Sequence, residues 1–278
     1  MVVGPISSFG VSSTSSSNIQ RINEKLQSAI SSLVSGSRIT QASDDIASLS
    51  IATQLQTELT ALREVSGNVA QNSSLLQVAD GGAEQISGLV EQLRSLSLQA
   101  RSPAVNDATR KSLNDQFQQV VSEIDRVAGN TDFNGRSLLD GSVSGDDALS
   151  IGQVFGNEGE GASLSIGSLN SESLFDGQSL DILSADSATR ALDALATALG
   201  NITDVRADIG AFQQSLDFVA VGIDSAIQNQ EAARSVLADA DIAEQSTIYA
   251  LLNTQRESAL ALQAQTNRLP EGLLKLVE

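Results

Sequence analysis

Carboxylates and serine hydroxyls are the most abundant side chains that could perform chemistry in this chain of 278 residues. The sequence has 34 Asp and Glu residues, 16 Lys and Arg residues, no His and no Cys. Without His and Cys, a Ser–His–Asp triad, a disulfide and a Cys/His metal site are excluded. Neither a Ser-x-x-Lys motif nor a glycine-rich phosphate loop is present. We therefore predict no catalytic residue, no cofactor and no enzyme activity.

Carboxylates alone support two kinds of site. A pair of carboxylates can hydrolyse a glycosidic bond, and counting residues does not exclude such a pair, but it needs a rigid pocket that a slender bundle rarely offers. Carboxylates also bind Ca²⁺. The acidic residues that cluster in the middle of the chain are Asp140, Asp146, Asp147, Glu158 and Glu160. Their spacing does not match the D-x-[DN]-x-[DN]-G pattern, so we predict a solvated acidic loop and no metal site.

The charge and composition restrict both the partners and the fold. A formal net charge of −18 argues against binding to nucleic acid and to anionic membrane surfaces. Aromatic residues make up only 3% of the chain, and Trp is absent. A core of Leu, Ile, Val and Ala suits the narrow seams between helices. Composition thus favours a helical bundle or coiled coil.

The sequence predicts neither a membrane span nor a Sec signal. No apolar run approaches the roughly 18–20 residues that a transmembrane helix needs. The N-terminal stretch "MVVGPISSFGVSSTSSSNIQ" has no basic residue before Arg21 and no long apolar core. If the protein leaves the cell, we expect another export route.

Heptad spacing predicts long helices in the first half of the chain. After a flexible arm over residues 1–17, the first seam is Ile19, Ile22, Leu26, Ala29 and Leu33, and it ends at Gly36. A second helix is expected from Asp44 to about Ala79. Gly81-Gly82 loosens its pattern, which then resumes from Ile86 to Ala100 until Pro103 stops it. A further helix is predicted by Leu113, Phe117, Val120, Ile124 and Val127.

The middle of the chain differs from the rest. Residues 129–181 are rich in Gly, Asn, Asp and Ser, and the alternating pieces Ala148–Ile151 and Ser163–Ile166 predict one or two β-hairpins. Near-heptad spacing returns at about Ser187. A final helix has the seam Ile248, Leu252, Ala259, Leu262, Leu269, Leu273 and Leu276.

These patterns predict a mainly α fold: an elongated antiparallel helical bundle or coiled coil built from both chain ends, with a small β-hairpin region in the middle. We expect a terminal coiled-coil domain (1–43 and 239–278), a rod-like helical domain (44–139 and 182–238) and a short β-rich outer tip (140–181). A two-helix coiled coil leaves much apolar surface exposed, which favours association with copies of itself. We therefore predict a polymer subunit.

Four segments resemble the bacterial flagellin family. Arg38-Ile39, Ala42, Asp44-Asp45 and Ala47 resemble the family pattern "SSGLRINSAKDDAAGLAIA", and "EIDRVAGNTDFNG" (123–135) is similar to its "EIDRV…FNG" segment. "ARSVLADADIAEQ" and "ALALQAQTNRLPEGLLKLV" are similar to its C-terminal region. The resemblance covers roughly residues 20–138 and 185–278, so the chain is similar to a short flagellin that lacks large variable outer domains.

The resemblance implies a function and partners. Paired terminal helices would line the interior of a flagellar filament made of identical or related flagellins, giving a secreted, extracellular subunit for motility. Family members are exported unfolded through the flagellar type III apparatus, so an export chaperone and cap or junction proteins are expected partners, without nucleic acid or membrane insertion.

The break "SGSRITQASDD" (35–45) would be the spoke between the terminal coiled coil and the rod. Gly36 permits a turn out of the first helix, and Ser43 is a plausible N-cap with Asp44 and Asp45 in the first turn. Capping alone explains the two carboxylates, whereas Arg38 or either Asp could instead contact a neighbouring subunit. The expected interface residues of the spoke and terminal helices are Gly36, Arg38, Ile39, Asp44, Asp45, Ile22, Leu26, Leu33, Leu252, Leu262, Leu269 and Leu273.

A second expected interface lies on the rod. Residues 90–100 resemble the flagellin segment "LQRVRELSVQA", which in the family packs against neighbouring subunits and is recognised by the Toll-like flagellin receptor of animals. The residues assigned to it are Gln92, Arg94, Ser95, Leu96 and Gln99, with Glu123 added. Because the family's first Arg is Gln92 here and its Glu is Ser95, we expect poor receptor recognition, with a receptor reporter assay as the test. Leu93 and Leu96 are also expected core residues.

Two alternative functions remain open at this stage. A hook–filament junction protein shares these terminal helices, but it usually has a differently built middle. A flagellin-like adhesin or ligand-binding protein at the cell surface would need a ligand patch in residues 140–181. That segment has no Lys or Arg, so a polyanionic ligand is disfavoured there, whereas a neutral sugar or a metal-bridged ligand is not.

Overall fold

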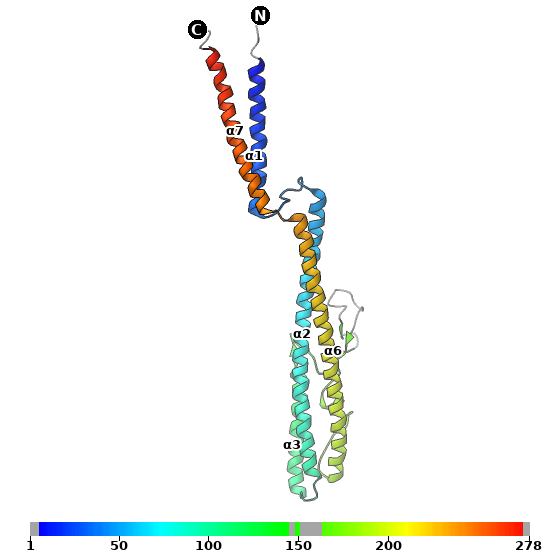
Figure 1. The fold of residues 1–278 in the computed structure, drawn as a ribbon. Coiled ribbons are helices and arrows are strands. Elements are labelled where there is room, and N and C mark those ends of the chain that lie inside the picture. Colours follow the sequence, from blue (N-terminus) through cyan, green and yellow to red (C-terminus); the bar gives the residue numbers. More distant parts are fainter. Residues whose placement is uncertain (1–5, 145–147, 151–162, 275–278) are drawn as a thin grey trace. The chain divides into compact units, whose positions relative to one another are not determined.

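The computed structural model describes residues 6–144, 148–150 and 163–274. Helices dominate it, as predicted from the heptad spacing (Figure 1). The chain forms two compact units: Met1–Thr60 with Ile227–Glu278, and Ala61–Ala226. We call them the terminal unit and the middle unit. No helix in the described part of the chain is long and apolar enough to span a membrane.

The terminal unit contains the helix pair α1 (Ile6–Ser35) and α7 (Ile242–Leu274), which run antiparallel (Figure 1). Leu26 and Ala29 of α1 are buried against Leu252 of α7. Ile22, Ile248 and Tyr249 pack against this cluster. The expected flexible arm is wrong from residue 6 onward, because α1 already begins at Ile6. Serine is only mildly unfavourable in a helix, and no proline interrupts residues 6–35.

Three long helices build the middle unit: α2 (Ile46–Arg101), α3 (Asp107–Asn130) and α6 (Ala185–Ala238), of which α2 and α6 also extend into the terminal unit. In Figure 1, α3 and α6 both run antiparallel to α2. Of the predicted seam and core residues, Leu93, Phe117 and Ile124 are buried, whereas Leu113 and Val120 are half-buried. Further buried residues of these helices are Leu76, Leu195 and Leu216. Spacing alone therefore identifies the core face of each helix.

The predicted loosening at Gly81-Gly82 is wrong, because α2 continues through both glycines without a break. The two glycines have different roles. A Cβ on Gly82 would lie 2.7 Å from Thr131 Oγ1 and 2.8 Å from Leu139 Cδ1, whereas a Cβ on Gly81 would have nothing within 4 Å. Gly82 thus lets the segment that follows α3 cross close to α2, and packing outweighs the helix cost of two glycines.

In the part of the β-rich middle that the structure describes there are two small antiparallel strand pairs, in agreement with the predicted hairpins. β1 (Asp132–Phe133) pairs with β2 (Arg136–Ser137) through a turn in which Asn134 and Gly135 both have positive φ, at 54° and 78°. Such angles favour Asn-Gly in a two-residue hairpin turn. β3 (Leu149–Ser150) pairs with β4 (Ser163–Leu164), and a single helical turn, α5 (Ser171–Leu174), follows.

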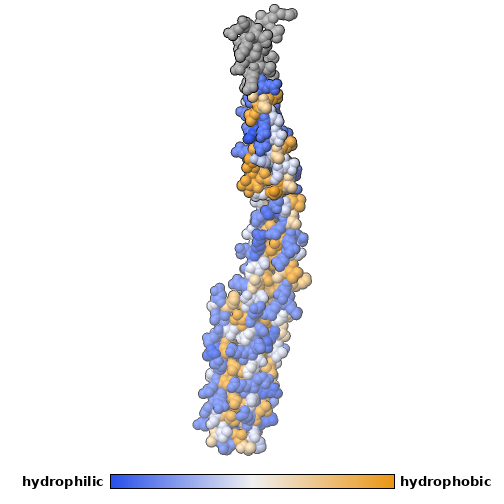
Figure 2. Space-filling view, turned by 60° about the vertical axis from the view of Figure 1, so that its left-hand side comes forward, coloured by the Kyte–Doolittle hydropathy of each residue, from blue (hydrophilic) through white to orange (hydrophobic). Residues whose placement is uncertain are grey.

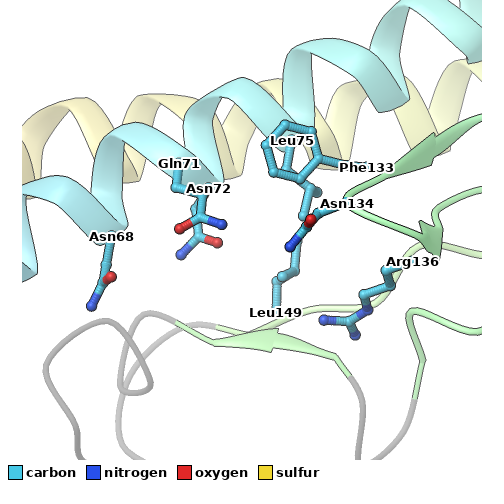
Figure 3. A pocket seen from close by; sticks show the side chains of 8 residues that line it. All are labelled: Asn68, Gln71, Asn72, Leu75, Phe133, Asn134, Arg136 and Leu149. Carbon is cyan, nitrogen blue, oxygen red and sulfur yellow. The ribbon is translucent and has the colours of Figure 1, made fainter.

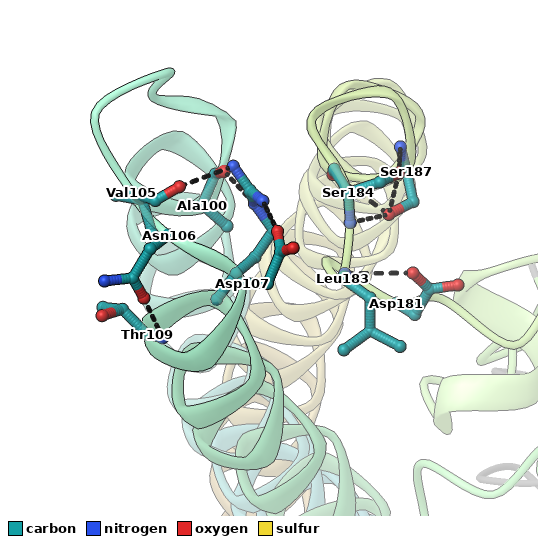
Figure 4. A network of polar contacts seen from close by, with 10 residues as sticks. Ala100, Val105, Asn106, Asp107, Thr109, Asp181, Leu183, Ser184 and Ser187 are labelled. Atoms are coloured by element: carbon teal, nitrogen blue, oxygen red, sulfur yellow. Dashed lines mark hydrogen bonds and ion pairs between the residues drawn. The ribbon is translucent and has the colours of Figure 1, made fainter.

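Polar contacts fix the end of the middle unit where α2 turns into α3 (Figure 4). Arg110 donates to the carbonyl oxygens of Ala100 and Val105, each at 3.0 Å, and to Asp107 Oδ1 at 2.9 Å. Asn106 caps α3 by accepting from the amide of Thr109 at 2.8 Å. These bonds satisfy backbone carbonyl and amide groups that have no helical partner where α2 ends and α3 begins.

Candidate functional site

The connector between α1 and α2 begins with a left-handed glycine. Gly36 has φ +68°, and its amide donates to the carbonyl of Ser32 at 2.9 Å, which closes the end of α1. A Cβ added to Gly36 would have nothing within 4 Å, so the backbone angle alone requires glycine. The predicted turn at Gly36 is confirmed.

This connector pairs with the return connector between α6 and α7. Arg38 N donates to the carbonyl of Ala238 at 2.7 Å, and Ala240 N donates to the carbonyl of Gly36 at 2.9 Å. The Arg38 guanidinium donates to the carbonyl of Leu237 at 2.7 Å and lies 3.8 Å from Asp45. Because these are contacts within one chain, Arg38 already has a structural role that requires no neighbouring subunit.

Asp44 and Asp45 have different roles from those predicted. α2 begins at Ile46, so Ser43 is not its N-cap and neither carboxylate lies inside the first turn. Asp45 is the N-cap: its Oδ1 accepts from the amide of Ser48, and its carbonyl accepts from Leu49, both at 3.0 Å. Asp44 Oδ2 accepts from the amides of Thr40 and Gln41, at 3.0 and 2.9 Å, and so folds the connector back on itself.

These bonds lower the pKa of both carboxyl groups. For Asp44 the chief cause of the lowered pKa is the backbone amide of Gln41, followed by that of Thr40. For Asp45 the chief cause is Ser48, and Arg38 adds a smaller electrostatic effect. A carboxyl whose pKa is lowered by folding stabilises the folded state above its ordinary pKa and loses this effect as the pH falls. The connector should therefore loosen in acid.

We expect the amide NMR shifts of Thr40 and Gln41 to move together as the pH is lowered from 6 to 2. The midpoint should lie below 3.8, the ordinary pKa of an Asp side chain, because both amides donate to the ionised form of Asp44. In the Asp44→Asn variant this titration should vanish, whereas the Ser48 amide should still report Asp45. A midpoint at or above 3.8 would contradict the assignment.

Sequence reasoning missed the return connector, residues 237–241. Asp241 Oδ1 accepts from the amides of Ala243 and Glu244, at 2.8 and 3.1 Å, and so caps α7. Asp241 followed three residues later by Glu244 is a capping-box pattern, and this signal could have placed the start of α7. The pairing of the two connectors has no local signal in the sequence.

Some of the interface residues predicted for the terminal unit are buried within the chain, and others are exposed. Leu26, Ile39 and Leu252 are buried within the chain, and Ile22 and Leu33 are half-buried. Leu262 is 61% exposed, and Val34, which was not predicted, is 82% exposed. Figure 2 shows hydrophobic residues interspersed among hydrophilic ones at the visible surface. Leu269 and Leu273 lie outside the residues whose side chains the structure describes.

The predicted rod segment, residues 90–100, also contains both buried and exposed residues. Leu93 and Leu96 are buried, which confirms them as core residues and leaves Leu96 inaccessible to a partner. Gln92, Arg94, Ser95 and Gln99 are exposed. The guanidinium of Arg94 lies 3.5 Å from the carboxylate of Glu91. Glu123 pairs with Arg126, which lowers the pKa of Glu123.

A groove of about 300 Å³ lies between α2 and the β1–β2 hairpin (Figure 3). Carboxamides from both sides line it, with Asn68 and Asn72 on α2 and Asn134 in the hairpin turn, beside Leu75 and Leu149. Among the described residues that line it there is no pair of carboxylates, so these residues do not fit glycoside hydrolysis.

The acidic cluster considered for Ca²⁺ is described only at Asp140. Its Oδ1 accepts from the amide of Ser142 at 2.9 Å, which lowers the pKa of this carboxyl. The carboxylate thus has a local role in the turn after β2. The remaining members of the cluster lie outside the described residues: Asp146, Asp147, Glu158 and Glu160.

In a comparison with known protein families, both ends of the chain match models of one family. The family model of the bacterial flagellin N-terminal helical region matches residues 6–144, and that of the bacterial flagellin C-terminal helical region matches residues 192–277. The chain is 31% identical over 252 residues to a flagellin of Halalkalibacterium halodurans, covering 90% of this chain and 91% of that protein.

Two further similarities extend this result. The chain is 29% identical over 267 residues to the flagellar filament 30.7 kDa core protein of Treponema maltophilum, covering 92% of this chain and 93% of that protein. A solved structure described as a putative flagellar hook-associated protein of Vibrio parahaemolyticus has a TM-score of 0.55 at 15% identity, over 70% of this chain and 99% of its own. At that identity the likeness concerns the fold alone.

Proposed function

This chain belongs to the bacterial flagellin family, and from that premise we propose that its terminal helix pair is the surface through which copies assemble into the flagellar filament. The chain is a structural subunit of that filament. Similarity over about nine tenths of both this chain and its flagellin relatives supports a filament subunit over a junction protein. We further propose that the protein is no enzyme, since its relatives are flagellins and the described residues that line the groove beside the hairpin include no paired carboxylates.

The observation that supports assembly through the terminal pair is its incomplete burial. Two helices cannot cover each other's apolar residues completely. Val34 and Leu262 remain 82% and 61% exposed, and Leu251 is exposed as well. Leu26 and Leu252 pack between α1 and α7 and hold the two helices together. They therefore support assembly indirectly, by keeping the exposed apolar residues in place. Apolar surface of this kind is buried when identical copies associate.

The paired connectors fix the path of the chain at the end of the terminal helix pair. Gly36, Arg38, Asp44 and Asp45 fix the path between the terminal pair and α2 through the hydrogen bonds described above. We propose that residues 1–43 and 239–278 line the filament interior, that 44–139 and 182–238 form the rod, and that 140–181 form the outer tip. Secretion through the type III apparatus, an export chaperone, and cap and junction proteins complete the proposal.

The test removes the exposed apolar groups without touching the core. In a Val34→Ser, Leu251→Ser, Leu262→Ser variant we expect the critical concentration for filament growth on seeds to rise at least about tenfold, since burying one such side chain contributes about 1.5–3 kcal/mol. Thermal unfolding of the monomer should change little. Leu183→Ser, which changes an exposed leucine of the middle unit, is the control. Unchanged growth of the triple variant would contradict the proposal.

A further inference from the structure

The groove between α2 and the β1–β2 hairpin is lined mainly by side chains that carry carboxamide groups (Figure 3). Asn68, Gln71 and Asn72 line it from α2. These residues and Leu75 occupy helix positions i, i+3, i+4 and i+7, which lie on one side of a helix. Asn134 lines the groove from the hairpin turn. Two segments that are far apart in sequence thus bring four carboxamides to one place.

These four carboxamides are not used by the fold. Among the described residues, no hydrogen bond involves any of the four side chains. Asn106, Asn114 and Asn170 of the same unit, in contrast, each accept a hydrogen bond from a backbone amide, at 2.8, 3.0 and 2.8 Å. A carboxamide has an oxygen that accepts and an NH₂ group that donates. The groove therefore suits a ligand whose polar groups also both donate and accept.

The charge of the lining favours an uncharged ligand. The chain has 34 Asp and Glu residues, yet none is among the eight described residues that line the groove, so these residues offer a cation no carboxylate. Arg136 is the one charged residue among them. Phosphate groups are recognised by clusters of Arg, and a single arginine is not such a cluster.

The groove also has an apolar part. Leu75 and Leu149 line it and are only 6% and 5% exposed, and Phe133 is half-buried beside Leu75 (Figure 3). Ligand sites usually combine apolar and aromatic side chains with a few polar groups, in a volume of about 300–1,000 Å³. The volume of this groove, about 300 Å³, fits a short ligand with an apolar face and a polar edge. A sugar ring has both.

We propose that this groove binds a 2-acetamido sugar of a glycan chain. The acetamide N–H and C=O complement the acceptor and donor of a carboxamide such as Asn72. Its methyl group packs on Leu75 and Leu149, and the C–H face of the sugar ring lies against Phe133. The sugar hydroxyls bond to the remaining carboxamides. Such binding goes beyond the filament function and does not depend on it.

Titration calorimetry of the full-length monomer with N,N′,N″-triacetylchitotriose tests the proposal. We expect saturable binding, and binding of maltotriose at least about tenfold weaker, because maltotriose has the same number of sugar rings but no acetamide groups. Absence of chitotriose binding, or equal binding of both sugars, would overturn the proposal.

Two substitutions remove carboxamides without disturbing the backbone. Asn134→Gly keeps the turn, since glycine adopts the positive φ of this residue freely, and Asn72→Leu has the better helix propensity. Each should weaken chitotriose binding about two- to tenfold, the effect of one lost hydrogen bond, and the two together at least about tenfold. Asn201→Leu, at an exposed position of α6 outside the lining, is the matched control and should bind normally. Unchanged binding by the double variant would refute this site.

NMR locates the ligand independently of these variants. The side-chain amide signals of Asn72 and Asn134 should shift with chitotriose and stay in place with maltotriose. Chitotriose shifts confined to other residues would place the ligand elsewhere and contradict the proposal. Comparison of N-acetylglucosaminyl-N-acetylmuramic acid with diacetylchitobiose separates two sources of 2-acetamido sugars: equal or tighter binding of the former indicates bacterial cell-wall glycan, and weaker binding indicates a chitin-type glycan.

Discussion

Replacing Gly82 with alanine is expected to lower the free energy of unfolding by about 1–3 kcal/mol, the usual cost of forcing an extra carbon into a packed site. The new Cβ would lie 2.7–2.8 Å from Thr131 and Leu139. Leu139 has a flexible tip, but the short Thr131 side chain is held by a 2.7 Å hydrogen bond to the carbonyl of Val127. The loss should appear as a lower urea midpoint.

Gly81→Ala is the matched control, and it should change stability in the opposite direction. Nothing lies within 4 Å of a Cβ at Gly81, so alanine gains about 0.5–1 kcal/mol from its better helix propensity. If both variants shift the urea midpoint in the same direction, the close crossing over Gly82 is wrong.

Phe117→Ala should produce the largest loss of stability of any single change considered, about 3–5 kcal/mol. Phe117 is fully buried in the core of the middle unit. Phe218→Ala removes the same side chain from an exposed site on α6, so the monomer should change by less than about 0.5 kcal/mol. Calorimetry of the two monomeric variants measures the difference. A strongly destabilised Phe218→Ala monomer would show that this side chain packs within its own chain.

Most of the helical architecture could be predicted from the sequence, because heptad spacing reports which face of a helix is buried. Leu93 and Phe117 occupy predicted core positions and are buried. The error at Gly81-Gly82 arises when glycine is judged by its helix propensity alone. Only the structure shows that the segment after α3 crosses at Gly82, a contact between residues far apart in sequence.

The connector could be predicted in part. Gly36 is identifiable because a glycine that follows a heptad seam indicates a left-handed C-cap. Asp44 and Asp45 are recognisable as capping residues, but their separate roles are not, because these depend on the path of residues 40–43. The partner of Arg38, the carbonyl of Leu237, lies 199 positions away and has no local signal.

The exposed patches could not be predicted, since periodicity gives the buried face of a helix and not what remains outside it. Phe218 is visible in the sequence as one more apolar residue, but only the structure shows that it is 81% exposed on α6.

Electron microscopy of the purified protein, with and without residues 1–43 and 239–278, tests assembly through the terminal helices most directly. We predict filaments from the full-length chain and only monomers from the shortened chain, with circular dichroism showing that the shortened chain remains helical. Filaments from the shortened chain, or none from the full-length chain even on filament seeds, would contradict assembly through these helices.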